Sequence, residues 1–225
     1  MTLRQSLHLF ASLILPLSAP MAQGAEKGIT LRLLACAVTK EPAKVFLQTK
    51  DSKSEGFDLP SSAFSEPVAV FARSVELKAP DNDVPLCSIT LPAEGKSFAV
   101  LLAQEKPAGF VPTVVRTDDA SFKAGDYYFI NRSANTVVLK LGGTEVVLEA
   151  GNAVKSRPTE PVHNHQYNVT MSSRSDSGDK IFASTRWPVA TNIRSYIVFL
   201  TGSGGKTSYR AVDEFVEQTG GRKKR

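Results

Sequence analysis

The stretch Gly125–Gly151, GDYYFINRSANTVVLKLGGTEVVLEAG, contains the clearest β-hairpin pattern in the chain. Two runs of alternating apolar residues flank Gly142-Gly143, and a Gly-Gly pair between such runs is typical of a two-residue hairpin loop. The loop sets the register of the strands. The expected pairs are Leu141 with Thr144, Lys140 with Glu145, Leu139 with Val146, Val138 with Val147, and Val137 with Leu148.

This register separates the hairpin into an apolar face and a mixed face. The apolar face, which belongs against a core, consists of Val137, Leu139, Leu141, Val146 and Leu148. On the other face Lys140 lies opposite Glu145, a charge pair suited to solvent, with Val138 and Val147 beside it. Grouped apolar residues on an outward face mark a contact surface, so we predict that both valines are covered by the first β unit of the chain, described below, or by a partner.

Asp126–Asn131 precedes the hairpin and is predicted to form a third strand, which would pair with it in an antiparallel sheet. The pattern of this region therefore predicts how its strands are arranged. It contains no catalytic or cofactor-binding motif.

Residues 1–25 fit a secretory signal peptide, because Arg4 provides a positive charge and Leu7–Leu17 an apolar run. Ala22-Gln23-Gly24 supplies small residues for cleavage. A membrane anchor is the alternative, but the apolar run is only about half of the roughly 20 residues that span a bilayer, and it contains Pro16. We expect a periplasmic or extracellular protein without an integral membrane segment once the signal is removed.

The chain has two cysteines, Cys36 and Cys87, each within an apolar strand-like run. An oxidising compartment would allow them to form a disulfide, whereas the alternative is two buried thiols that pack as small hydrophobic groups. Leu33-Leu34-Ala35-Cys36 also resembles the end of a lipoprotein signal, but Glu26, Lys27 and Arg32 interrupt the apolar run that such a signal requires.

The net charge of +5 does not indicate a nucleic-acid partner. Arg222–Arg225 (RKKR) and Arg4 together account for the whole excess, so the body of the chain is neutral. We expect residues 218–225 to form a disordered basic tail, and we expect no nucleic acid among the partners.

The rest of the chain alternates short apolar runs with turn-forming residues, which predicts an all-β fold of antiparallel β-sandwich architecture. We expect two β-sandwich units in tandem, 26–116 and 122–217, separated by a short polar segment. In the first unit, the run from Val68 to Leu77 loses its alternation, which predicts a bulge or a kink near residues 72–74. In the second, Arg194–Leu200 is apolar on both faces and should be buried on both sides.

The end of the second unit, YRAVDEFVEQTG, fits either a strand or a short helix. We favour the strand, because the preceding GSGG is typical of a hairpin loop.

His163 and His165 are the only local cluster of side chains that bind metals readily. They would share a face of an extended chain and could ligate zinc or copper, but a third ligand would have to come from elsewhere. Pro161 and the polar neighbours are more typical of a solvated loop.

Trp187, the only tryptophan, lies beside Arg186 at the end of an apolar run. An exposed pair of this kind could stack on a sugar ring or anchor a protein partner, although an aromatic plug at the edge of the sandwich explains it as well. No serine has a nucleophile-elbow context, and no glycine cluster has the residues of a phosphate loop, so we expect no cofactor.

The order of three motifs, Gly125-x-Tyr-x-Phe-x-Asn131 before a glycine-centred hairpin, Ser184-x-Arg-Trp187, and RSYIVFL, resembles a group of uncharacterised secreted bacterial proteins. A looser likeness is to small periplasmic β-sandwich accessory proteins of exopolysaccharide acetylation. The resemblance implies an exported β-sandwich and carries no catalytic residues.

These patterns predict an exported, non-enzymatic β-sandwich protein that binds another envelope component, either a protein or a polysaccharide. The candidate binding residues are Trp187, Arg186, Val138 and Val147. The alternatives are a metal-dependent hydrolase that uses His163 and His165, and a purely structural subunit.

Overall fold

The computed structural model describes residues 28–37, 44–81, 84–106, 109–161, 164–176 and 178–216. The expected signal peptide, the basic tail and His163 lie outside the described residues. The described part is all-β and has one 3-10 turn, Ser203–Gly205, with no α-helix. No helix in this part is long and apolar enough to cross a membrane.

The first unit consists of a four-stranded sheet in the order β3-β1-β6-β7 and a three-stranded sheet in the order β2-β4-β5. The strands of this unit are β1 Ile29–Ala37, β2 Phe46–Gln48, β3 Val68–Val70, β4 Ser74–Lys78, β5 Cys87–Thr90, β6 Ser97–Lys106 and β7 Gly109–Arg116.

The second unit consists of two four-stranded sheets, in the orders β11-β8-β14-β15 and β10-β9-β12-β13. Its strands are β8 Tyr127–Arg132, β9 Thr136–Leu141, β10 Thr144–Leu148, β11 Ala153–Ser156, β12 Gln166–Ser175, β13 Gly178–Pro188, β14 Ile193–Thr201 and β15 Thr207–Phe215.

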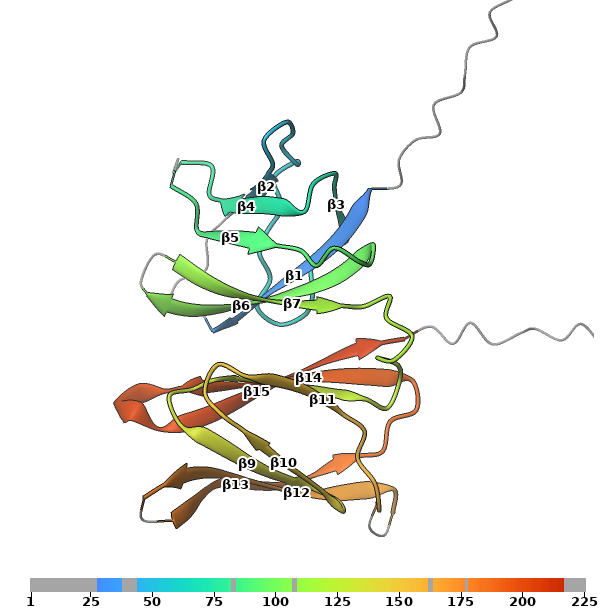
Figure 1. Cartoon of the computed structure of the whole chain (residues 1–225), viewed down its shortest axis with the longest axis vertical. Helices are drawn as coiled ribbons and strands as arrows, with labels where there is room; N and C mark the ends of the chain where they lie inside the picture. The colour runs from blue at the N-terminus through green and yellow to red at the C-terminus, as the bar shows by residue number, and fades with distance from the viewer. Residues whose placement is uncertain are drawn as a thin grey trace, which may run out of the picture.

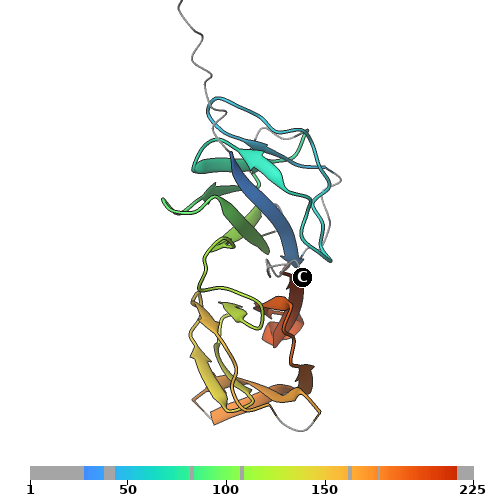
Figure 2. The same ribbon diagram turned by 90° about the vertical axis from the view of Figure 1, so that its right-hand side faces the viewer.

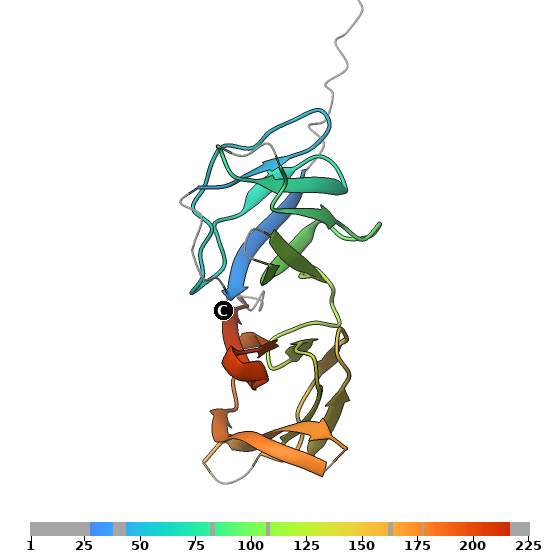
Figure 3. The same cartoon turned by 90° about the vertical axis from the view of Figure 1, so that its left-hand side faces the viewer.

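The four sheets are stacked as four layers (Figure 1). Residues such as Leu33 and Ile89 form the core within the first unit, and residues such as Phe129 and Met171 form the core within the second. A third cluster joins the units, because Leu34 and Leu101 pack with residues of the second unit that include Tyr196. Figures 2 and 3 show the blue β1 strand of the first unit above the red strands of the second.

The two middle sheets are therefore buried on both faces. In β14, Ile197 and Phe199 face the second core, whereas Tyr196 and Val198 face the first unit. The prediction of two-sided burial for Arg194–Leu200 is confirmed. Apolar residues at consecutive positions are what such a strand requires.

The two units share one topology, although their sequences show no sustained repeat. In β3-β1-β6-β7 and in β11-β8-β14-β15, the outer pairs are antiparallel and the central pair is parallel. The order β2-β4-β5 likewise matches β9-β12-β13. The equivalent sheets of the two units are the ones that pack against each other.

The predicted register of the β9–β10 hairpin is confirmed at all five pairs, from Leu141 with Thr144 to Val137 with Leu148. Gly142 has a φ of 58°, and a Cβ at this position would lie 2.3 Å from the carbonyl oxygen of Thr159. Both the positive φ and the close approach of Thr159 therefore require glycine at position 142.

The predicted third strand of this sheet is wrong. β8 lies in the opposite sheet, where it pairs with β11 and β14. Asn131 holds the crossing between the sheets, because its side-chain nitrogen donates to the carbonyls of Asn135 and Leu148, and its side-chain oxygen accepts from the backbone and hydroxyl of Ser133. With these bonds, the chain between β8 and β9 crosses from one sheet to the other as an arch and does not form a tight hairpin.

Of the two alternatives for the run from Val68 to Leu77, the kink is confirmed, because the chain bends at residues 71–73. The bulge is wrong, because the run divides into β3 and β4, which belong to different sheets. Arg73 lies at the break, and its guanidinium donates to the carbonyls of Pro92 and Gly95. At the other end of the chain, YRAVDEF is part of strand β15, as favoured, and not of a helix.

The possible disulfide is not formed, because Cys36 and Cys87 are both free and buried. Cys36 faces the cluster between the units, whereas Cys87 faces the core of the first unit. Burial raises the pKa of each thiol to about 12. The reading of the two cysteines as packed thiols fits this structure.

Val138 is buried, with 3% of its surface exposed, but its cross-strand partner Val147 is 49% exposed. The first unit covers neither of them, because it packs against the sheet that contains β14. Cover by the first unit is therefore wrong. Cover of Val147 by a partner stays a prediction.

Candidate functional site

The structure separates the two adjacent residues Arg186 and Trp187. Successive residues of a strand point to opposite faces, so Trp187 packs against the core of the second unit while Arg186 is exposed on the outer face. The two side chains do not form one binding surface, and Val138 and Val147 lie in the same outer layer as Arg186.

Trp187 lies in an aromatic cluster at the edge of the second unit. Its ring is nearly parallel to that of Tyr127, with centroids 5.5 Å apart, and its centroid lies 6.2 Å from that of Tyr209 on β15. The side chain is half-buried. One part of the Trp187 side chain therefore packs against the core of the second unit, and the other part belongs to the protein surface.

A cavity of about 100 Å³ opens beside this cluster. Tyr127, Trp187 and Ile193 line it, together with Ser195 and Asp213 from the adjacent strands β14 and β15. The Ser195 hydroxyl donates to the Asp213 carboxylate over 2.6 Å. Burial, with smaller contributions from Tyr167 and Asp213, raises the pKa of Tyr127 to about 12. The cavity therefore combines an aromatic wall with one carboxylate.

The wall formed by β15 is uncovered. Ala211 and Asp213 lie opposite Ile197 and Ser195, on the face of the sheet that points into the second unit, yet both are exposed. Phe215 continues the row and is 74% exposed. β13 and β15 are each an edge strand of their sheet, and the contact between Trp187 of β13 and Tyr209 of β15 places these two edges on the same side of the unit.

We call this surface the open-edge groove, and it consists of Tyr127, Trp187, Ile193, Ala211, Asp213 and Phe215. A second cavity, of about 240 Å³, adjoins it at Tyr127 and contains Arg157. The guanidinium of Arg157 donates to the Asp126 carboxylate over 2.6 Å and to the carbonyl of Ala124 over 2.7 Å. The groove therefore has polar groups of both signs near its aromatic wall.

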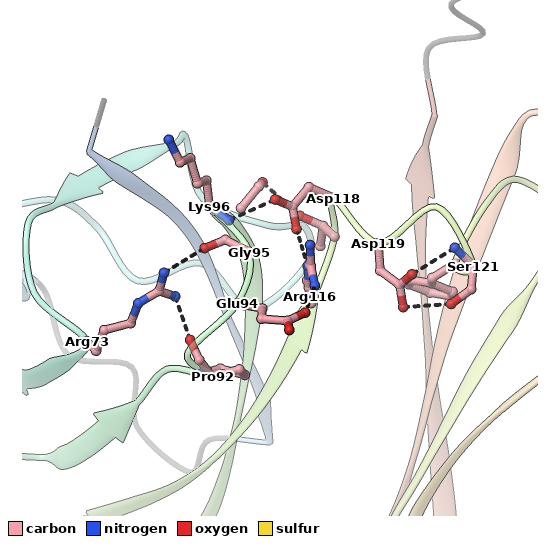
Figure 4. A network of polar contacts seen from close by, with 12 residues as sticks. Arg73, Pro92, Glu94, Gly95, Lys96, Arg116, Asp118, Asp119 and Ser121 are labelled. Carbon is pink, nitrogen blue, oxygen red and sulfur yellow. Dashed lines mark hydrogen bonds and ion pairs between the residues drawn. The ribbon is translucent and has the colours of Figure 1, made fainter. Parts of the chain in front are cut away.

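A separate polar network lies where the first unit leads into the second (Figure 4). The guanidinium of Arg116 donates to Asp118 over 2.8 Å and to Glu94 over 3.1 Å, while the backbone amide of Lys96 donates to Asp118. Asp119 accepts from the backbone and the hydroxyl of Ser121. Hydrogen bonds from Ser121 lower the pKa of Asp119.

A cavity of about 360 Å³ adjoins this network, and its lining includes Pro92, Phe122 and Tyr128. Its cations are already paired, because Arg116 contacts Glu94 and Asp118 while Lys155 contacts Asp119 and Ser121. The network explains how the linker is held and leaves little unpaired charge for a ligand.

A buried network of charges connects the two units. Glu214 accepts two hydrogen bonds from Arg194, of 2.6 and 3.0 Å, and one of 2.6 Å from the hydroxyl of Tyr196. Arg32 of the first unit also forms an ion pair with Glu214. Arg194 donates further to the carbonyls of Thr117 and Phe122 in the linker. This network ties β1, the linker and β15 together, which is a structural role.

Within the described ranges, no three His, Cys, Asp or Glu side chains are grouped as metal ligands would be. His165 lies in an exposed turn with a φ of 54°, and His163 lies outside the described residues. The structure thus does not test the histidine pair.

The sequence identified Trp187 but missed Asp213 and Phe215. A signal was present, because alternation along TSYRAVDEF places Tyr209, Ala211, Asp213 and Phe215 on one face. Asp213 and Phe215 stand at the end of this row, which faces into the unit. A charged residue in such a place indicates that the other sheet does not cover this edge of β15.

No protein-family model matches this chain, and none of the curated proteins matches it in sequence. The resemblance to secreted bacterial β proteins rests on the quoted motifs alone.

Proposed function

We propose that this protein is an exported, non-enzymatic binding protein that holds another envelope component in the open-edge groove of its second unit. One observation carries the proposal, namely the exposed inward face of β15. Buried apolar faces are the rule in a sandwich, so exposure of Phe215 together with a half-buried tryptophan marks a contact surface. Export is supported by the signal-like residues 1–25.

The composition of the groove favours binding over chemistry. Aromatic side chains are enriched where proteins bind ligands and partners, because a rigid ring offers a large apolar area at a small entropic cost. Among the described residues, Asp213 is the only carboxylate that lines the cavity beside Trp187, and its hydrogen-bond donor is a serine. Glycoside hydrolysis, for example, usually uses a pair of carboxylates.

A comparison of two exposed phenylalanines tests the proposal. Phe215→Ser removes an apolar side chain from the groove, and Phe71→Ser removes an equally exposed one, 66% against 74%, from the first unit. Binding of the mature protein to two panels, purified envelope polysaccharides and a displayed random peptide library, is measured for each variant. We expect Phe215→Ser to weaken binding at least fivefold and Phe71→Ser to leave it unchanged.

Equal affinities of both variants and the wild type for every ligand found would show that binding occurs elsewhere. Turnover on ester or glycoside panels that a single substitution abolishes would replace the proposal with an enzymatic function. Zinc or copper bound stoichiometrically, and lost in His163→Ala with His165→Ala, would favour the metal-dependent alternative.

A further inference from the structure

We propose that the occupant of the open-edge groove is an extended segment of a different protein, which adds to β15 as a new antiparallel or parallel strand. This inference rests on the proposed function and specifies its ligand class. It follows from a comparison of the two units, which have the same topology but different closure at one edge.

In the first unit the equivalent edge is closed. β7 occupies the place that β15 occupies in the second unit, and the segment that leads into β5 contacts it. The backbone amide of Phe110 donates to the carbonyl of Leu86 over 2.9 Å, and Phe110 packs against the core. In the first unit, the segment before β5 therefore already bonds to this edge.

In the second unit no described segment does the same. β13 is the equivalent of β5, but within the described residues the backbone partner of β15 is β14 alone. β15 is nine residues long, from Thr207 to Phe215, so its outer edge offers a row of amides and carbonyls. Such a row is a template for a further strand.

The other long edge, β13, is protected in ways that β15 is not. β13 carries a register shift opposite Met171 and Ser172, and it bears exposed charges at Lys180 and Arg186. Bulges and charges of this kind discourage pairing. On β15, by contrast, the charged side chains are engaged within the protein. Arg210 donates to the carbonyl of Cys36, and Asp213 accepts from the hydroxyl of Ser195.

The groove indicates which side chains the added strand would carry. Every second residue would face Ala211, Asp213 and Phe215. The cavity of about 100 Å³ accommodates a single apolar side chain, since pockets for whole small molecules are usually ~300–1,000 Å³. Asp213 favours a basic or hydroxyl-bearing residue nearby. The expected ligand is a peptide with apolar residues at alternate positions and a basic residue among them.

The experiment uses peptides selected from a random library against the mature protein, with Phe215→Ser for counter-selection. Backbone amide exchange is measured along the chain with and without the best peptide. We expect slower exchange in β15 and little change in β11, the opposite edge of the same sheet.

Methylated peptides test the backbone bonds. N-methylation at two alternate positions that face β15 should weaken binding about tenfold or more, whereas methylation at the two intervening positions should have little effect. Equal losses in both peptides, or unchanged exchange in β15, would overturn strand addition.

The outcomes separate the two proposals. A polysaccharide that binds in a Phe215-dependent manner while no peptide does would keep the groove as the binding site and overturn the strand. Protection of β15 that appears without peptide and increases with protein concentration would identify a second copy of this chain as the occupant and would also overturn it.

Discussion

Val138 and Val147 are direct cross-strand neighbours on the outer face of the β9–β10 hairpin, yet one is buried and the other is half exposed. Their row continues through Ser172 on β12 to Ile181 on β13. Val138 is therefore enclosed by strands on both sides, whereas Val147 lies on the edge strand β10. The burial of Val138 comes from its own sheet and not from the other unit.

This difference predicts that a valine-to-aspartate substitution has a large effect on stability at position 138 and a small effect at position 147. Val138→Asp should lower the free energy of unfolding by about 3–5 kcal/mol, because a charge would be buried without a partner. Val147→Asp should change it by less than about 0.5 kcal/mol, as for most surface substitutions. Urea denaturation of both variants measures the difference. Similar losses in the two variants would mean that Val138 is not enclosed as described.

The Glu214 network predicts that the two units unfold together. Glu214→Gln removes the charge that pairs with Arg194 and Arg32, and it should cost about 3–5 kcal/mol, because two guanidinium groups would lose their counter-ion. Glu145→Gln is the control, since Glu145 forms an exposed pair with Lys140 that is worth roughly 1 kcal/mol or less. We expect a single denaturation transition for the wild type, and two separate transitions would contradict the shared interface.

The hydrogen bonds of Asn131 predict how much this side chain stabilises the crossing between the sheets. Asn131→Ala should destabilise the protein by about 2 kcal/mol or more, because the buried carbonyls and the Ser133 donors would lose their partner. Asn168→Ala provides the matched control, because Asn168 is exposed on the neighbouring sheet. Thermal denaturation distinguishes them. Equal melting temperatures would show that the arch does not depend on this side chain.

The buried thiols predict a loss of stability at high pH. Folding raises the pKa of Cys36 and of Cys87 from 9.0 to about 12, because burial disfavours the thiolate. The native state therefore prefers the neutral thiol, so this contribution is complete below pH 9.0 and is lost progressively as the pH rises toward 12. Burial of Tyr196, whose pKa rises from 10.0 to about 12, acts in the same direction.

Denaturant titrations at intervals across this alkaline range check the prediction. The native protein should also resist alkylation at both cysteines at pH 8, and unfolding should expose both. Rapid modification of either thiol in the native state would contradict the burial of that cysteine.

The sequence was sufficient for local structure and insufficient for the path of the chain between sheets. The hairpin at Gly142 was predictable because its register depends on neighbouring residues alone. The crossing after β8 was not, because it depends on Asn131 and its contact with Leu148, 17 residues away. Apolar residues on both faces of β14 indicated two-sided burial but could not identify the first unit as the covering layer.

The candidate site was partly visible in the sequence. Trp187 was recognised because it is the only tryptophan, but its ring neighbours Tyr127 and Tyr209 come from strands of the other sheet. Arg186 was grouped with it wrongly, since adjacency in a strand places side chains on opposite faces. The open edge at Phe215 depends on where the outer sheet ends, which only the packed structure determines.

The fluorescence of Trp187 tests the central claim most directly, because the chain has one tryptophan and it lines the open-edge groove. The mature protein is titrated with the ligand found in the binding panels, and its affinity is measured independently by calorimetry. We predict a saturable change in emission with the same dissociation constant, and the loss of both signals in Phe215→Ser but not in Phe71→Ser. Tight calorimetric binding with unchanged tryptophan emission would place the ligand elsewhere and contradict the account.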